Sequence, residues 1–307
     1  MRRANKKKSR KLWIIIPLLI LLLIGLGITG YAYSIYHNAK DKVNNEMQAP
    51  VESIDTTVTK EKTEAKEPLN ILLLGVDQRK GDRGRSDALM VLSLDPSSNS
   101  SRLISIPRDT RTTIIGKGYE DKINHAYAFG GSDMSVATVE NFLDIDLDYY
   151  VRVNMEGLKE IIDEIGPITV DNEIAWEGNG YDFEVGPTVM DGDKTMKYVQ
   201  MRKKDPNGDF GRTERQRKVV QAIIDEGASI ASVTKANRMI DILGDNMATN
   251  LDFEDMKTLI ADYKSTRQNI TTHQISGTGT TIDGIYYLIV PDEEIEKVHS
   301  MMKGNGV

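Results

Sequence analysis

The sequence predicts a single layered α/β/α domain around a mixed central sheet, preceded by one N-terminal transmembrane helix. Short apolar runs typical of buried strands alternate with longer segments of helical periodicity, an order that favours a layered α/β fold. A long apolar block precedes them near the N-terminus. Of the 307 residues, 240 follow position 67, which is enough for one sizeable domain.

The apolar block covers residues 12–36 and predicts the transmembrane helix. From Leu12 to Ile28 every residue is apolar, Gly or Pro, and no charge appears until Lys40. Roughly 20 helical residues, each rising about 1.5 Å, span the hydrocarbon core of a bilayer. A cleaved signal peptide is the alternative, but the apolar run is longer than a usual signal and no A-x-A site follows it.

The basic tail at residues 1–11 sets the orientation. It carries seven Lys and Arg without an acidic residue, so the positive-inside rule places it in the cytoplasm. Residues 37–67 mix Lys, Glu, Thr and Asn with few large apolar side chains, which predicts a flexible extracytoplasmic linker. We therefore expect a single-pass type II membrane protein whose domain, residues 68–307, lies outside the cell.

Net charge and cysteine content exclude some functions. The formal net charge is −7, and without the seven tail cations 32 basic residues face 46 acidic ones, a balance of −14. Such an acidic domain is a poor candidate for nonspecific nucleic-acid binding. The chain has no Cys, so disulfides and Cys-ligated zinc are excluded. An arginine cluster inside this acidic domain needs a local explanation.

The expected strands and helices place charged residues at one edge of the sheet. The expected strands are residues 69–75, 88–94, 102–106, 149–153, 168–170, 273–275 and 286–290. The expected helices are residues 132–142, 155–165, 212–231, 234–243, 253–263 and 292–302. Charged side chains lie where the first three strands begin or end, and ligands of α/β sheets bind at such an edge.

Two carboxylates stand out at that edge. Asp77 follows the first strand, and Asp87 ends the Gly- and Arg-rich loop before the second. Two carboxylates held together suit Mg²⁺, which usually takes one or two of them together with phosphate oxygens and water. An Asp pair after strands is as often loop chemistry, through Asx-turns. The pair alone leaves both interpretations open.

Residues 201–217 form an Arg-rich stretch. Four arginines fall within sixteen residues there. A helix that begins near Arg212 would put Arg212, Arg215 and Gln216 on one face. Arginine forks match phosphate oxygens bidentately. An Arg-rich helix face is more often a solvated surface, so the spacing alone does not decide for a phosphate site.

Five strings in these regions resemble a known family. They are NILLLGVD at 70–77, GRSD at 84–87, SIPRDT at 105–110, DKINHAY at 121–127 and DPNGDFGR at 205–212. Together they are similar to the LytR–CpsA–Psr family over roughly residues 68–230. The short tail, the single membrane helix and the lack of accessory domains resemble the wall teichoic acid transferases of that family.

The resemblance implies a phosphotransferase. Such an enzyme would take an anionic glycopolymer, here expected to be wall teichoic acid, from undecaprenyl pyrophosphate. The C6 hydroxyl of N-acetylmuramic acid in peptidoglycan would attack the sugar-linked phosphorus and release undecaprenyl phosphate. The expected partners are this donor, peptidoglycan and the membrane on the wall side of a Gram-positive cell, without nucleic acid. Phosphoryl transfer needs mainly positioning and charge stabilisation, which Mg²⁺ and arginines supply.

The resemblance also implies the site residues. Asp77 and Asp87 would hold Mg²⁺, with Mn²⁺ as an alternative, against the pyrophosphate. The expected catalytic residues are Asp87, a candidate base, with Arg85 and Arg108. The expected pyrophosphate-binding residues are Arg85, Arg108, Arg202, Arg212, Arg215 and Gln216. An apolar channel must hold the prenyl chain, and helical residues 219–224 are candidates for its wall.

One position departs from the family pattern. Gln200 stands where the family commonly has the first Arg of an Arg-x-Arg pair. Gln can still donate hydrogen bonds, so we expect retuned substrate binding rather than inactivity.

Two other functions are weaker alternatives. A transcriptional attenuator is disfavoured because a cytoplasmic tail of eleven residues is too short for a helix-turn-helix. A non-catalytic prenyl-pyrophosphate binding protein is disfavoured because it would have less use for two carboxylates facing an anionic ligand.

Other candidate metal patterns are discounted. Asp144, Asp146 and Asp148 alternate, but the Gly and Glu of an EF-hand loop are absent, so we expect a solvent-facing strand edge. The four histidines form no paired spacing typical of zinc sites. For His125 we expect a structural hydrogen-bonding role.

Overall fold

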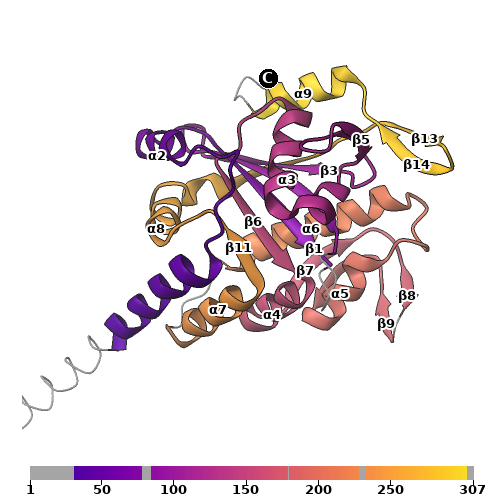
Figure 1. The fold of residues 1–307 in the computed structure, drawn as a ribbon. Helices are drawn as coiled ribbons and strands as arrows, with labels where there is room; N and C mark the ends of the chain where they lie inside the picture. The colour runs from indigo at the N-terminus through magenta and orange to yellow at the C-terminus, as the bar shows by residue number, and fades with distance from the viewer. Residues whose placement is uncertain (1–30, 78–83, 179, 228–232, 303–307) are drawn as a thin grey trace, which may run out of the picture.

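The computed structural model describes residues 31–77, 84–178, 180–227 and 233–302, and a six-stranded sheet forms the centre of this part (Figure 1). Its order is β11–β6–β1–β2–β3–β12. β1 runs parallel to β6 and antiparallel to β2, and β3 runs parallel to β12. The bounds are β1 Leu69–Val76, β2 Ser86–Asp95, β3 Ser100–Ile106, β6 Tyr149–Asn154, β11 Met247–Thr249 and β12 Asn269–Gln274. The mixed central sheet that the sequence predicts is confirmed.

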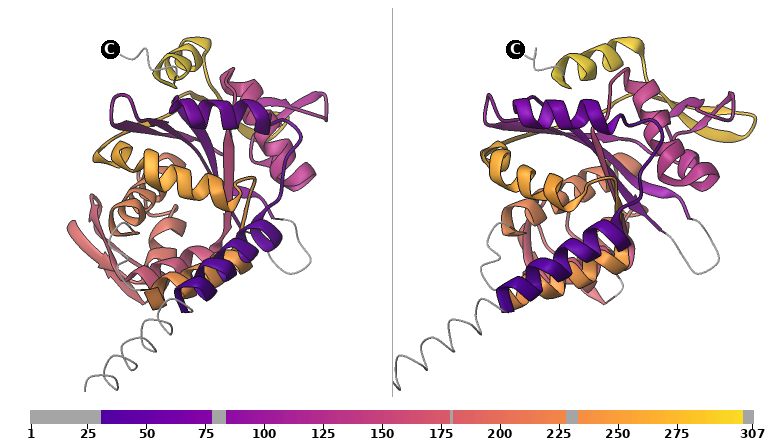
Figure 2. Two further views of the ribbon diagram at one scale, coloured as in Figure 1. Left: turned by 90° about the vertical axis from the view of Figure 1, so that its left-hand side faces the viewer. Right: turned by 60° about the vertical axis from the view of Figure 1, so that its left-hand side comes forward.

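Helices cover both faces of this sheet because its central strand β1 is apolar on both. Leu72 and Leu74 belong to one core with Val136 of α3 (His125–Leu143) and Val298 of α9 (Asp292–Met302). Leu73 faces α4 (Met155–Ile165) and α6 (Asp209–Gly227) on the other side. Figures 1 and 2 show these layers on the two sides of the sheet. A central strand buried on both faces reads as a continuous apolar run, as residues 71–76 do.

Smaller elements surround the sheet. The predicted bounds of α4 and α9 are confirmed, and α6 begins three residues earlier than expected, at Asp209. The sequence predicted one strand each of the β7–β10 and β13–β14 hairpins, but it predicted neither the β4–β5 and β8–β9 hairpins nor α5, which are short segments. These and the remaining elements are β4 Arg111–Ile114, β5 Tyr119–Lys122, β7 Ile168–Asn172, β8 Trp176–Gly178, β9 Tyr181–Phe183, β10 Gly186–Met190, α5 Gly192–Gln200, α7 Val233–Asn246, α8 Phe253–Asp262, η2 Lys264–Gln268, β13 Thr278–Ile282 and β14 Ile285–Ile289.

The flexible linker predicted for residues 37–67 is not what the structure shows. Residues 31–42 are helical, the helix continues as η1 (Val43–Met47), and α2 (Thr56–Ala65) follows. Val43 and Met47 are buried against Met247 of β11. Asp55 caps α2 by accepting hydrogen bonds from two backbone N–H groups of its first turn. The folded domain therefore includes this segment, because a few apolar side chains suffice to dock an otherwise polar stretch.

A buried ion pair also fixes α2 to the domain. Lys62 Nζ lies 2.5 Å from Asp148 Oδ1, and Asn70 N–H donates to the other oxygen of the same carboxylate. Asp148 is only 2% exposed, so the solvent-facing position expected for this acidic run is wrong at Asp148. Burial raises the pKa of Asp148 above its ordinary value, although Lys62 and Asn70 oppose that shift.

Removing the Met47 side chain should destabilise the whole domain. Met47 is 2% exposed, and truncating a buried Met to Ala typically costs about 2–5 kcal/mol. We expect Met47→Ala to lower the free energy of unfolding in urea by that amount. Val58→Ala is the matched control, because Val58 is 49% exposed on α2. Equal stability of the two variants would contradict the docked arrangement.

The predicted membrane anchor falls largely outside the described residues. The predicted tail at 1–11 and residues 12–30 of the predicted transmembrane segment lie there. Within the described ranges, no helix is long and apolar enough to cross a bilayer.

Candidate active site

The two predicted metal ligands lie on neighbouring strands at one edge of the sheet. β1 ends there, and β2 begins there. The register between these strands shifts at Gly75 and Val76, so Asp87 sits in a bulge, and a bulge re-aims a side chain. Asp77 follows β1 directly, and its N–H donates to Arg85 O at 3.2 Å.

Arg108 joins Asp87 at this edge, two residues beyond β3. Its Nη1 donates to Asp87 Oδ1 at 2.6 Å. Its Nε lies 3.7 Å from Asp209 Oδ1 and 3.9 Å from Asp109 Oδ2. Burial alone would lower the pKa of Arg108, but the hydrogen bond to Asp87 and the charge of Asp209 raise it above its ordinary value. Two of the three predicted catalytic residues, Asp87 and Arg108, are thus in direct contact.

Two more arginines lie near this pair, Arg212 in the first turn of α6 and Arg202 in the loop before that helix. Arg212 Nη2 lies 2.5 Å from Asp209 Oδ1, and Arg202 Nε lies 3.7 Å from the same oxygen. Burial lowers the pKa of Arg212, against the charge of Asp209, and the charge of Arg108 adds to the lowering. An arginine stays protonated at physiological pH all the same. Arg108, Arg202 and Arg212, which we call the arginine cluster, therefore form a cationic centre.

Buried polar atoms of this centre lack hydrogen-bond partners within the described part of the chain. They are Arg108 Nε, Arg212 Nε and Nη2, Asp209 Oδ1 and Gln216 Oε1. Buried polar atoms are normally paired, so each exception calls for an explanation. Unsatisfied guanidinium donors gathered around one point indicate a site for an anionic ligand.

Arg215 is the predicted binding residue that the structure places elsewhere. Its Nε donates to Tyr198 O at 3.1 Å, its Nη2 to Met201 O and its Nη1 to Asp205. The Arg215 side chain is 5% exposed and that of Asp205 is fully buried. Gly211 permits this pairing, because a Cβ there would collide with the Asp205 carboxylate. Arg215 therefore fixes the loop that carries Arg202 instead of facing a substrate.

Two further sequence-selected residues lie on the surface. Arg85 is exposed beside residues 78–83, which lie outside the described ranges. Gln200, the position that departs from the family pattern, is the exposed last residue of α5. Asp209 was not singled out by sequence reasoning. The signal that could have found it is an acidic residue one helical turn before Arg212.

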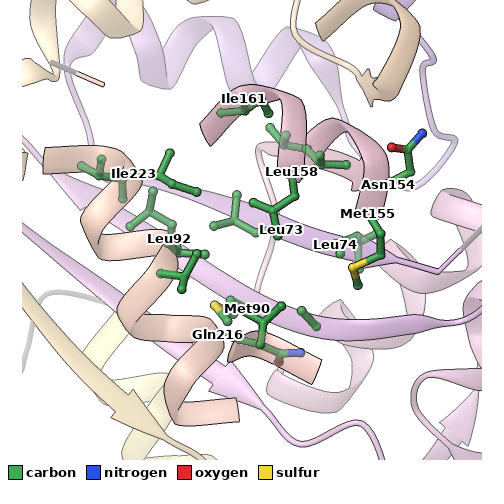
Figure 3. A pocket seen from close by; sticks show the side chains of 18 residues that line it. Leu73, Leu74, Met90, Leu92, Asn154, Met155, Leu158, Ile161, Gln216 and Ile223 are labelled. Carbon is green, nitrogen blue, oxygen red and sulfur yellow. The ribbon is translucent and has the colours of Figure 1, made fainter. Parts of the chain in front are cut away.

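An apolar cavity of about 280 Å³ opens between the sheet and helices α4 and α6. Figure 3 shows Leu73, Leu158 and Ile223 from these elements around it. Four residues of the segment proposed for a lipid channel line the cavity, namely Val219, Val220, Ile223 and Ile224. The segment expected to line a lipid channel thus lines an apolar cavity in the structure.

Gln216 connects the cavity with the arginine cluster. It lines the cavity beside Met90 (Figure 3) and lies one turn after Arg212 on α6. Residues at i and i+4 share a helix face, so the cluster continues directly into the cavity wall. The geometry suits a ligand with an anionic group joined to an apolar chain.

The carboxylates at this edge are compatible with a divalent cation. In the described ranges, no group of three or more His, Asp or Glu side chains could hold a metal ion by itself. Asp77 and Asp87 supply two carboxylates, and Mg²⁺ commonly takes one or two together with phosphate oxygens and water. The donor set therefore fits Mg²⁺ in the company of a phosphate ligand.

Comparison with known proteins assigns the family. The model of the LytR_cpsA_psr family matches residues 29–304. This chain belongs to that family. It is 44% identical over 306 residues to the polyisoprenyl-teichoic acid–peptidoglycan teichoic acid transferase TagU of Bacillus subtilis strain 168, covering 99% of this chain and 98% of the relative.

Solved structures of family members share the fold. The crystal structure of B. subtilis TagU aligns with a TM-score of 0.65 at 42% identity, over 78% of this chain and 97% of TagU. A structure of TagT bound to LIIa-WTA aligns with a TM-score of 0.67 at 26% identity, over 85% of this chain and 97% of TagT. With named transferases related to it over nearly its whole length, this LytR–CpsA–Psr protein is an enzyme of the transferase class.

Proposed function

We propose that this enzyme transfers wall teichoic acid, an anionic glycopolymer, from undecaprenyl pyrophosphate to peptidoglycan outside the cell membrane. The observation that carries the proposal is the continuity of two sites along α6. The arginine cluster around its first turn suits a pyrophosphate, and the apolar cavity along its next turns suits a prenyl chain. The relatives named as teichoic acid transferases support the same assignment.

The donor would bind in two parts. Arg108 and Arg212 have buried N–H groups without hydrogen-bond partners, and these groups would contact the pyrophosphate oxygens. The half-exposed Arg202 would contact the pyrophosphate from the solvent side. The first isoprene units would enter the cavity. A cavity of about 150 Å³ holds one benzene, so about twice that volume holds on the order of ten carbons. The rest of the long prenyl chain would stay in the membrane.

Asp77 and Asp87 would hold Mg²⁺ at the pyrophosphate. The ion would neutralise the negative charge that collects on the phosphate oxygens. Within the chain, the hydrogen bond from Arg108 orients the Asp87 carboxylate and ties the metal-holding edge to the arginine cluster.

The reaction exchanges the phosphoanhydride bond of the donor for a phosphate ester bond to peptidoglycan. The C6 hydroxyl oxygen of N-acetylmuramic acid attacks the sugar-linked phosphorus, and the bond from this phosphorus to the bridging oxygen breaks. A phosphodiester to peptidoglycan forms, and undecaprenyl phosphate leaves with the bridging oxygen. The hydroxyl proton passes to a base, for which Asp87 is the candidate within the site. The arginines stabilise the charge on the transferred phosphoryl group and on the leaving phosphate.

An in vitro transfer reaction tests this proposal. Full-length protein in liposomes would receive a prenyl-pyrophosphate-linked glycopolymer precursor and uncrosslinked peptidoglycan, with Mg²⁺ or with a chelator. We expect release of prenyl phosphate and polymer-bearing peptidoglycan with Mg²⁺, and a large loss of rate after chelation. No release in either condition would sink the transferase proposal. An unchanged rate with the chelator would exclude only a role for the metal ion and would leave the transferase proposal standing.

A further inference from the structure

One carboxylate oxygen occupies the centre of the arginine cluster. Asp209 Oδ1 lies 2.5 Å from Arg212 Nη2 and 3.7 Å from the Nε atoms of both Arg108 and Arg202. These three arginines come from different segments: the loop after β3, the loop before α6 and the first turn of α6. An oxyanion of this chain therefore stands at the point on which all three guanidinium groups converge.

The contacts of Asp209 are ionic but poorly directed. Asp209 Oδ1 and Arg212 Nη2 are close, yet both atoms stay without a hydrogen bond of acceptable geometry among the described residues. The Nε atoms of Arg108 and Arg212 are unpaired there as well. Arg212 as a whole is 8% exposed, so water has little access to these donors. One carboxylate offsets only part of the positive charge of the cluster and leaves several of its N–H groups without a hydrogen bond, whereas a pyrophosphate has more oxygens to offer.

We propose that Asp209 is an internal counter-ion that occupies the pyrophosphate position in the empty site and competes with the substrate for it. This inference rests on the proposed pyrophosphate site. With no donor bound, the Asp209 carboxylate holds the three guanidinium groups together against their mutual repulsion. When a donor molecule binds, its phosphate oxygens replace Asp209 as the ionic partners of the arginines. The Asp209 side chain then turns away from the like charge of the phosphates.

The position of Asp209 suits such a movement. Its backbone is held at the start of α6, where its carbonyl oxygen accepts a hydrogen bond from Thr213 Oγ1 at 3.0 Å. Its carboxylate is held by ionic contacts to the cluster, which a phosphate can replace. The side chain can therefore rotate while the helix stays in place.

Competition by Asp209 has a consequence for turnover. A site without it would bind every phosphate more tightly, the leaving undecaprenyl phosphate included. Binding that strengthens substrate and product alike lowers KM without raising kcat. Asp209 thus acts as a positioning residue that limits the affinity of the arginine cluster and favours product release.

Calorimetric binding of inorganic pyrophosphate tests the inference. We compare the full-length wild type with Asp209→Asn, Asp209→Glu and the control Asp225→Asn, which removes an exposed carboxylate from the same helix. Like charges a few ångströms apart repel strongly in a partly buried site, so Asp209→Asn should bind about tenfold tighter or more. Asp209→Glu restores the charge and should bind like the wild type, as should Asp225→Asn.

The steady-state kinetics of the transfer reaction provide a second test. Asp209→Asn should lower both KM for the donor and kcat, a split that simple loss of fold would not produce. Pyrophosphate affinity that is equal or weaker in Asp209→Asn, while the wild type binds, overturns the counter-ion inference and leaves the proposed function standing. Absence of pyrophosphate binding in all four proteins overturns both. Binding by Asp209→Asn alone supports the inference.

Discussion

Replacement of Arg108 by alanine is expected to reduce transfer at least about hundredfold, the loss typical for removal of one preorganised charge-stabilising donor. Arg108 is the residue through which the metal-holding edge and the arginine cluster meet, since it contacts both Asp87 and Asp209. The loss should appear mainly in kcat, because the charge on the phosphoryl group and leaving phosphate grows in the transition state. Arg108→Lys should recover only part of it, because an ammonium cannot make two forked contacts.

Arg102→Ala is the matched control for this experiment. Arg102 lies on the same strand, β3, but lines a separate pocket near the far end of the strand. Its removal should leave kcat and KM for the donor unchanged. Circular dichroism and thermal melting establish that both variants are folded. Normal turnover by a folded Arg108→Ala variant would show that the site has been assigned to the wrong residues.

Filling the apolar cavity should weaken the binding of the donor by displacing part of its prenyl chain. Val220 lines the cavity from α6, and a Trp there would take up space that otherwise holds a few carbons of the prenyl chain. Each buried CH₂ contributes about 0.8 kcal/mol, so the loss of three would weaken binding by about 2.4 kcal/mol, roughly fiftyfold. Val220→Trp should therefore raise KM for a long-chain donor by that factor and affect a short-chain donor much less.

The control for the cavity experiment is Val58→Trp, which adds the same bulk to an exposed valine of α2. Should Val220→Trp prove unstable in urea, Val220→Phe makes the same comparison with less added volume. An equal effect of the variant on long-chain and short-chain donors would exclude the cavity as the lipid site.

The sequence predicted those parts of the fold that depend on apolar periodicity. β1 was found because residues 71–76 are apolar on both faces, and α4 because its apolar residues recur at helical spacing. The folded segment at 37–65 was missed because only a few apolar side chains, Val43 and Met47 among them, dock a polar stretch. No local pattern reveals that their partner is Met247, some 200 positions along the chain.

The prediction of the site residues from sequence had the same limit. The family motifs brought Asp87, Arg108 and Arg212 onto the candidate list, and the structure places the three together. Arg215 was grouped with Arg212 and Gln216 by helical spacing, but a helix turns about 100° per residue, so Arg215 points well away from Gln216. Tertiary packing decides which of these side chains meets the buried Asp205, and helical spacing carries no information about that packing.

The central claim is that one donor molecule joins the arginine cluster to the apolar cavity along α6. A crystal structure of the enzyme with Mg²⁺ and a short-chain prenyl-pyrophosphate disaccharide tests it most directly. We predict pyrophosphate oxygens at hydrogen-bond distance from Arg108 and Arg212, with the prenyl carbons between Leu73 and Ile223. A pyrophosphate bound away from these arginines, or a prenyl chain outside the cavity, would contradict the account.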